Sequence, residues 1–153
     1  MKRLLAIEVE GVRIAVHLDT VERVVRMVAV TPLPSVPPII RGLINDRGRL
    51  LPVVDPRVRF GLTAREPRLD DRLVIVRTPE RCLALVASEV HGVLEVEDAE
   101  AVPVTSILPS GGSVEAVVRL PDGLLLIQDM GRFLSLEEEM ALRSVAGSTG
   151  EPR

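Results

Sequence analysis

The stretch IIRGLINDRGRLLPVV, residues 39–54, decides the fold class of this chain. Two apolar runs, 39–44 and 49–54, flank the tetrapeptide NDRG, whose asparagine, aspartate and glycine tolerate the backbone angles of a tight turn. The stretch therefore predicts a β-hairpin. Its second run is apolar at positions 50, 51, 53 and 54, so we expect both faces of that strand to be covered.

Short strands of this kind recur on both sides of the hairpin. We predict them at 4–9, 13–18, 27–30, 73–76, 82–86, 92–96, 114–120 and 124–128, with turns at 10–11 and 121–123. The 24 valines, beside two phenylalanines and no tyrosine or tryptophan, favour sheet over helix. The chain is therefore predicted to be all-β, a barrel or a sandwich.

Few helices are expected. One short helical turn is predicted at 21–25 and another at 57–60, where Asp55 is a good N-cap and Pro56 a good first residue. A C-terminal helix is predicted to begin at Ser135 with a capping box and to end near residue 146, before Gly147.

Two connecting segments have distinctive compositions. The segment 31–38 holds four prolines, so it is either a linker or a stiff segment that packs on the domain surface. The polar segment 63–71 is the predicted flexible loop.

Length and charge limit the function classes. The chain has 153 residues, which favours one domain, and a net charge of −3, which offers no strong field to a phosphate backbone. Its single cysteine excludes a disulfide framework. No apolar run reaches the roughly 20 residues of a membrane helix, and Glu8 and Glu10 interrupt the N-terminal run too early for a secretory signal. We expect a cytoplasmic protein that neither binds nucleic acid nor inserts into a membrane.

Residues that carry chemistry are sparse. His17 and His91 have no further histidine, cysteine or clustered carboxylates at ligand spacing, so we predict ordinary strand or loop histidines. Cys82 opens an apolar strand and is predicted to be a buried small hydrophobe. The carboxylates at 70–71 and 137–139 are predicted to be solvated, and no glycine pattern forms a phosphate-binding loop. We predict no catalytic residue, no cofactor and no metal.

The block 21–62 remains the most distinctive part of the chain. It joins the predicted turn at 21–25, the proline-rich segment and the hairpin turn that presents Asp46 and Arg47. Two interpretations stay open: a barrel corner whose prolines protect a sheet edge, or a rigid docking surface.

This block resembles the CheW family of chemotaxis coupling proteins. The matching residues are Val21-Glu22-x-Val24, Pro34-x-x-Pro37, the run from Ile40 to Asp55, Arg57 and Phe60-Gly61-Leu62. The family pattern is apolar-Arg-Gly-apolar-apolar-Asn-apolar-Arg-Gly, then two variable residues and apolar-Pro-apolar-apolar-Asp-Leu-Arg. Weaker similarity extends the resemblance over most of residues 3–146.

Three residues depart from the family pattern. Asp46 stands where the family usually has an apolar residue, Pro56 replaces the usual leucine after Asp55, and Ser88 stands where a second motif has its aspartate. Asp46 changes the predicted exposed turn itself, so it bears on partner preference.

The resemblance implies a fold and a role. The fold is two small five-stranded SH3-like β-barrel subdomains around a shared core, in one domain over 1–147 with an approximate break near 63–72 and a flexible tail at 148–153. The role is a non-enzymatic adaptor that links the cytoplasmic hairpin tip of a methyl-accepting chemoreceptor to the regulatory domain of the histidine kinase CheA. Association with other CheW-like chains is left open. The implied partner-binding residues are Val21, Glu22, Val24, Arg41, Gly42, Asn45, Asp46, Arg47, Leu73 and Val90.

The residues themselves suggest how such contacts would be made. Val21 and Val24 would meet an apolar stripe on a helix, and Arg41 and Arg47 would pair with carboxylates. For Arg47 the alternative is an internal salt bridge with Asp46 or Asp55. Gly42 has either a steric role, since a side chain would block a close approach, or a place in a strand bulge.

Two other functions are considered. A CheW-like adaptor of a different chemosensory pathway, for surface motility or second-messenger control, is motivated by Asp46. A small-ligand β-barrel or an unrecognised hydrolase would need a pocket in which His17, His91 and Ser88 converge.

Overall fold

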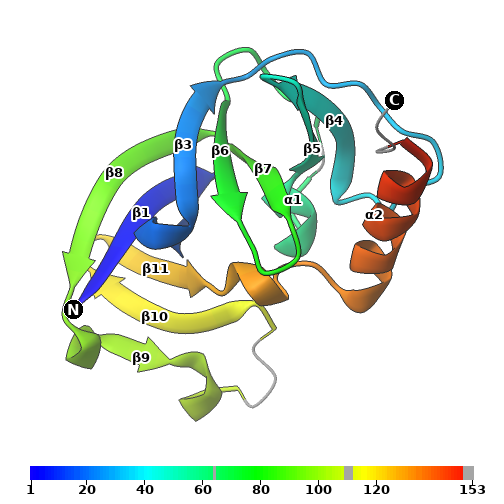
Figure 1. Cartoon of the computed structure of the whole chain (residues 1–153). Helices are drawn as coiled ribbons and strands as arrows, with labels where there is room; N and C mark the ends of the chain where they lie inside the picture. The colour runs from blue at the N-terminus through cyan, green and yellow to red at the C-terminus, as the bar shows by residue number, and fades with distance from the viewer. Residues whose placement is uncertain (64, 109–111, 150–153) are drawn as a thin grey trace.

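The computed structural model describes residues 1–63, 65–108 and 112–149, without the side chains of 144–149. Within these ranges the strands form two sheets (Figure 1). The six-stranded sheet has the order β8 (Glu89–Val96), β1 (Lys2–Val9), β2 (Val12–His17), β11 (Gly123–Gln128), β10 (Val114–Leu120), β9 (Ala101–Pro103). The five-stranded sheet has the order β3 (Val21–Arg26), β6 (Arg72–Arg77), β7 (Cys82–Ala87), β5 (Arg49–Val54), β4 (Ile40–Asp46).

Helices are few in the described part of the chain. They are α1 (Pro56–Arg59), α2 (Leu136–Thr149) and the 3-10 turns Leu18–Thr20, Asp98–Glu100, Val104–Ser106 and Met130–Arg132. No described helix has both the length and the apolar character needed to cross a membrane. The prediction of an all-β fold with a C-terminal helix is confirmed, and the three-residue strand β9 gives one sheet a sixth strand.

Each sheet has a core of its own, and both contribute to a third core between them. The six-stranded sheet buries Leu4 and Ile127 in its own cluster, and the five-stranded sheet buries Leu73 and Ile75. The third cluster takes residues from both sheets, and Leu142 of α2 packs into it. We call this third cluster the shared core, and it matches the predicted one.

Strand β7 shows why several strands are apolar on both faces. Leu83 and Leu85 contact the shared core, whereas Ala84 and Val86 contact the core of the five-stranded sheet. A strand between two cores has no polar face. The same expectation for β5 is confirmed for residues 51–54, which are all buried, but not for Leu50, which is 53% exposed.

The chain visits the two sheets in turn. It begins with β1 and β2, crosses at Leu18–Thr20 to build the five-stranded sheet, and returns after β7 at Ser88. The segment 63–72, where we predicted the approximate break, leads from α1 into β6, and the strands on both sides of it belong to the same sheet. The chain therefore crosses between the two sheets at Leu18–Thr20 and at Ser88, and not within 63–72.

The hairpins predicted at 10–11 and 45–48 both form, and each has two central turn residues. Glu10 and Gly11 have φ values of 48° and 86°, and Arg47 and Gly48 have 54° and 88°. Positive φ at both central residues is the type I′ geometry that matches the twist of paired strands. The second turn is narrower than predicted, because β4 continues to Asp46.

Two local predictions are wrong. Residues 21–25 form the strand β3 rather than a helical turn, because three β-branched valines favour extended backbone and β3 pairs antiparallel with β6. No strand forms at 27–30, where the chain leaves the sheet. Pairing resumes at a single bridge between Thr31 and Leu43 of β4.

The predicted helix starts are confirmed. The Asp55 carboxylate accepts a hydrogen bond from the Arg57 backbone N–H (3.0 Å), and Ser135 and Glu138 form the reciprocal capping box. Helix α2 continues through Gly147 to Thr149, past its predicted end. Of the predicted tail 148–153, residues 150–153 lie outside the described residues.

The proline-rich segment packs against the domain. Val36 contacts the shared core, which fits a stiff packed segment rather than a linker.

Candidate functional site

Charged side chains from four strands gather beside the hairpin turn Arg47–Gly48. They are Glu22 and Arg23 of β3, Asp46 of β4, Arg49 of β5 and Arg77 of β6, which together we call the turn cluster. Arg49 Nη2 donates to Glu22 Oε1 (2.9 Å) and to Asp46 Oδ2 (3.0 Å). One arginine thus joins two of the predicted site residues.

Glu22 is held as an anion by its neighbours. Hydrogen bonds from Arg49 and from the Cys82 thiol, with the charges of Arg49 and Arg77, lower the pKa of Glu22 from 4.5 to about 2. Burial, together with the adjacent Glu22 carboxylate, raises the pKa of the Cys82 thiol. Cys82 is half-buried rather than fully buried, because its Sγ lies 3.1 Å from Glu22 Oε2 at the edge of the core.

Asp46 lies beneath the turn. Its side chain is only 9% exposed and forms ion pairs with Arg23 and Arg49. The hydrogen bond from Arg49 and the nearby Arg23 charge lower the pKa of Asp46. In the free chain the Asp46 carboxylate is used by Arg23 and Arg49, and a contact of Asp46 with a partner stays a prediction.

Arg47 is the exposed residue of the turn. Its backbone has a φ of 54°, a conformation that costs a residue with a side chain about 1–3 kcal/mol. The two internal carboxylates proposed as partners are engaged elsewhere, Asp46 with Arg23 and Arg49, and Asp55 with Arg57. In the described part of the chain Arg47 forms no ion pair, so its guanidinium is available to a second molecule.

The exposed Asn45 and the buried Gly42 both shape the hairpin. The Asn45 side-chain oxygen accepts a hydrogen bond from the Gly48 backbone N–H (2.7 Å) and fixes the turn. Gly42 is buried with a φ of 144°, and a Cβ there would overlap the Thr31 carbonyl oxygen and lie 2.8 Å from its carbon. The strand register also shifts at this point.

Gly42 therefore lies at a strand bulge and also allows a close approach. The group that approaches it is the backbone of Thr31 in the same chain, not a partner. Gly42 admits the bridge in which Thr31 and Leu43 exchange two backbone hydrogen bonds of 2.9 Å. Gly42 is buried in the free chain, and a contact of Gly42 with a partner stays a prediction.

Arg41 lies away from the turn cluster. Its Nη2 donates to Glu66 Oε2 (3.2 Å) and to the Arg65 carbonyl (3.3 Å). It lines an open hollow of about 390 Å³ that includes Pro32 and Val36 of the proline-rich segment. Arg41 and Arg47 therefore belong to separate surfaces.

The apolar site residues divide by burial. Val21 packs against the shared core, and Val24 is 39% exposed opposite Val74 of β6. Val90 of β8 is half-buried against the same core. Leu73 is fully buried inside the five-stranded sheet of the free chain, which gives no support to its predicted partner contact.

Ser88 takes part in a network that links the two sheets. The fully buried Arg57 donates to Asp55 Oδ1 (3.0 Å), to Glu10 Oε1 (2.7 Å) and to Ser88 Oγ (3.3 Å). Hydrogen bonds from Arg57 and then Arg65 lower the pKa of Glu10. Ser88 stands where the family motif has an aspartate, and it offers Arg57 only a hydroxyl. Glu10 of the β1–β2 turn supplies the carboxylate instead.

Sequence reasoning missed Arg23, Arg49 and Arg77 as members of the turn cluster. Arg49 had a detectable signal, because a two-residue turn places it directly opposite Asp46 in the hairpin. Arg23 and Arg77 lie on β3 and β6, and their approach to the turn depends on the order of strands in the sheet.

The family model of the CheW-like domain matches residues 3–138. The chain is 29% identical over 106 residues to the chemotaxis protein CheW of Rhizobium meliloti, covering 69% of this chain and 68% of that one. It is 26% identical over 142 residues to the chemotaxis protein CheW of Bacillus subtilis, covering 92% and 91%. The crystal structure of the scaffolding protein TtCheW from Thermoanaerobacter tengcongensis superposes with a TM-score of 0.79 at 25% identity, covering 90% of this chain and 94% of that one.

The fold and its hairpin motif thus define a chemotaxis scaffold or adaptor domain, a class of proteins that are not enzymes. The chain belongs to the CheW family.

Proposed function

We propose that this chain couples chemoreceptor tips to the regulatory domain of the histidine kinase CheA in the cytoplasm, as a non-enzymatic scaffold of the signalling array. Membership in the CheW family supports this role. The single observation that carries it is Arg47, an exposed arginine in a costly backbone conformation without an internal carboxylate among the described residues. Glu10 has a similar positive φ together with internal ion pairs, so it is the exposed guanidinium of Arg47, unpaired among the described residues, that supports a contact with a second molecule.

The turn cluster makes the Arg47 surface rigid before any partner arrives. The ion pairs of Arg49 with Glu22 and Asp46 fix the strands on both sides of the turn. A preorganised surface loses little conformational entropy on binding. We assign this surface to a carboxylate-bearing partner, because arginine pairs well with carboxylates.

A second surface suits a helical partner. Val24 is 39% exposed and lies on the same side of β3 as Val21, beside the shared core. An amphipathic helix would cover Val24 with one apolar residue of its stripe. We assign this surface to the receptor hairpin.

Calorimetric titration with the regulatory domain of a CheA-like kinase from the same genome tests the first assignment. The wild-type chain should bind, and Arg47→Glu should weaken binding at least about tenfold because it reverses the charge. Glu137→Gln is a matched control, since it changes a charge on the first turn of α2. A folded Arg47→Glu chain that binds like wild type removes Arg47 from the interface.

The other functions considered are not favoured. A different pathway was motivated by Asp46 in a predicted exposed turn, whereas the Asp46 side chain is only 9% exposed and forms ion pairs with Arg23 and Arg49. The three residues required for a hydrolase do not converge: His17 contacts Glu115, His91 contacts Glu8, and Ser88 contacts Glu10 and Arg57.

A further inference from the structure

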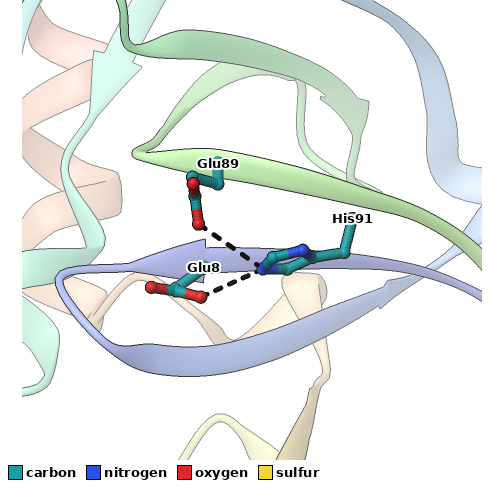
Figure 2. A group of neighbouring side chains, drawn as sticks. All are labelled: Glu8, Glu89 and His91. Carbon is teal, nitrogen blue, oxygen red and sulfur yellow. Dashed lines mark hydrogen bonds and ion pairs between the residues drawn. The ribbon is translucent and has the colours of Figure 1, made fainter.

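Glu8, Glu89 and His91 converge on one face of the six-stranded sheet (Figure 2). His91 Nε2 lies 3.0 Å from Glu8 Oε1 and 3.8 Å from Glu89 Oε2. One donor atom from each residue lies within 4.8 Å of the other two. Sequence reasoning assigned His91 no carboxylate ligands: Glu89 is two residues away on the same strand, but Glu8 is 83 residues away and only strand pairing brings it near.

The sheet itself holds the three side chains together. Glu8 of β1 and Glu89 of β8 are directly opposed in the antiparallel pairing. The register then shifts, so that Ile7 faces Val90 and Ala6 faces Gly92, which leaves His91 as the extra residue of a β-bulge. A bulge re-aims a side chain, and here the imidazole points back toward both carboxylates (Figure 2).

The cation beside Glu8 on β2 is engaged elsewhere. Arg13 is directly opposite Glu8, but its guanidinium makes a bidentate ion pair with Asp122, including an Nη2–Oδ2 bond of 2.7 Å. The Asp122 pair raises the pKa of Arg13, which stays charged. Glu8 therefore meets His91 rather than an arginine.

The cluster lies where the interior of the six-stranded sheet opens to solvent. His91 and Arg13 line a hollow of about 280 Å³ whose other walls include Ala6, Leu94 and Leu125 of the sheet's own core. Glu8 is 25% exposed and His91 is 45% exposed. An ion bound here would keep positions open to water.

We propose that Glu8, Glu89 and His91 bind one divalent transition-metal ion, of which Zn²⁺ is the representative. Imidazole nitrogen and carboxylate oxygen are both zinc ligands. Two donors each about 2.1 Å from a tetrahedral ion lie about 3.4 Å apart. The observed separations from His91 Nε2, 3.0 and 3.8 Å, bracket that value, so small side-chain rotations suffice.

Metal binding would fasten the edge strand β8 to β1. The ligands come from two neighbouring strands, so an ion bound to the folded chain stabilises the folded state. Such an ion should bind in a one-to-one ratio and raise the thermal midpoint.

The test uses the full chain, free of any affinity tag and stripped with chelator, titrated with Zn²⁺ by calorimetry and followed by thermal unfolding. We expect one site, and a thermal midpoint that rises with Zn²⁺ concentration. His91→Gln should remove the site, and Glu89→Gln should weaken it about tenfold or more. His17→Gln is the matched control, because His17 faces a single carboxylate, Glu115, at the same 3.0 Å, and zinc binding should be unchanged.

Mg²⁺, which prefers all-oxygen ligands, should neither bind measurably nor shift the midpoint. Circular dichroism confirms that the variants are folded. The proposal is overturned if the wild-type chain shows no zinc heat and no shift, or if the His91→Gln chain binds zinc as the wild type does.

Discussion

Arg23 of β3 forms a bidentate ion pair with Asp46 of β4, and these strands are the two edges of the five-stranded sheet. The ion pair therefore connects the two edge strands, which are not paired with each other through their backbones. Beyond β3, the Thr31–Leu43 bridge makes a second link to β4. Open edges invite pairing with other chains, so closure by an ion pair and a short bridge protects this sheet.

Replacing Asp46 by leucine tests that closure. Asp46→Leu follows the family pattern, but we expect it to lower the urea midpoint because Arg23 and Arg49 lose their shared carboxylate. Binding of the kinase regulatory domain should also weaken, because the pair of Arg49 with Asp46 helps to fix the turn that carries Arg47. Improved kinase binding at unchanged stability would contradict the closure role.

A single substitution can distinguish a role of Arg47 in binding from a role in stability. Arg47→Gly removes the guanidinium and relieves the positive φ of 54°, so the chain should be as stable as wild type or more stable. Kinase affinity should still fall at least about tenfold. Urea unfolding and calorimetry measure the two effects on the same sample. Loss of stability without loss of affinity would assign Arg47 to the fold.

Gly42→Ala should destabilise the chain by about 2–3 kcal/mol, because the new methyl group overlaps the Thr31 carbonyl and breaks the bridge to Leu43. Gly48→Ala is the matched control. It also has a positive φ, 88°, but open space around its Cβ position, so only about 1 kcal/mol is expected from backbone strain. Equal costs for both variants, measured by urea unfolding, would mean that contact with Thr31 contributes nothing.

The lowered pKa of Glu22 predicts that its contribution to stability is lost in acid. Its pKa is lowered from 4.5 to about 2 in the folded chain, so the folded state binds fewer protons than the unfolded state between these values. The stability from Glu22 is complete above pH 4.5 and is lost as the pH falls toward about 2. Urea midpoints of wild type and Glu22→Gln should differ at pH 7 and converge near pH 2. A constant difference across that range would show that the carboxylate charge is not responsible.

Much of the fold could be predicted from local patterns. Period-two apolar runs located most strands, and the Arg47–Gly48 turn followed from its residues. The helical turn at 21–25 was mispredicted because the caps at 19–20 are local signals, whereas the pairing of β3 with β6 is a long-range one. Helix α2 passes Gly147 because a single glycine tolerates helical backbone at a cost of about 1 kcal/mol.

The candidate site was predicted less completely, for a physical reason. The resemblance indicated which residues matter but not which way they face, so the buried Leu73 and the internally paired Asp46 were grouped with the exposed Arg47. The turn cluster and the Glu8–His91 pair both depend on contacts across the sheet between residues far apart in sequence. Such contacts leave no local pattern.

The coupling role is tested most directly by co-sedimentation of a CheA-like kinase with membranes that carry a chemoreceptor from the same genome. We predict that the wild-type chain increases the kinase in the pellet and that Arg47→Gly, although folded and still bound to receptor, does not. Kinase recovery that is the same with and without the wild-type chain, for every receptor and kinase pair of that genome, would contradict it.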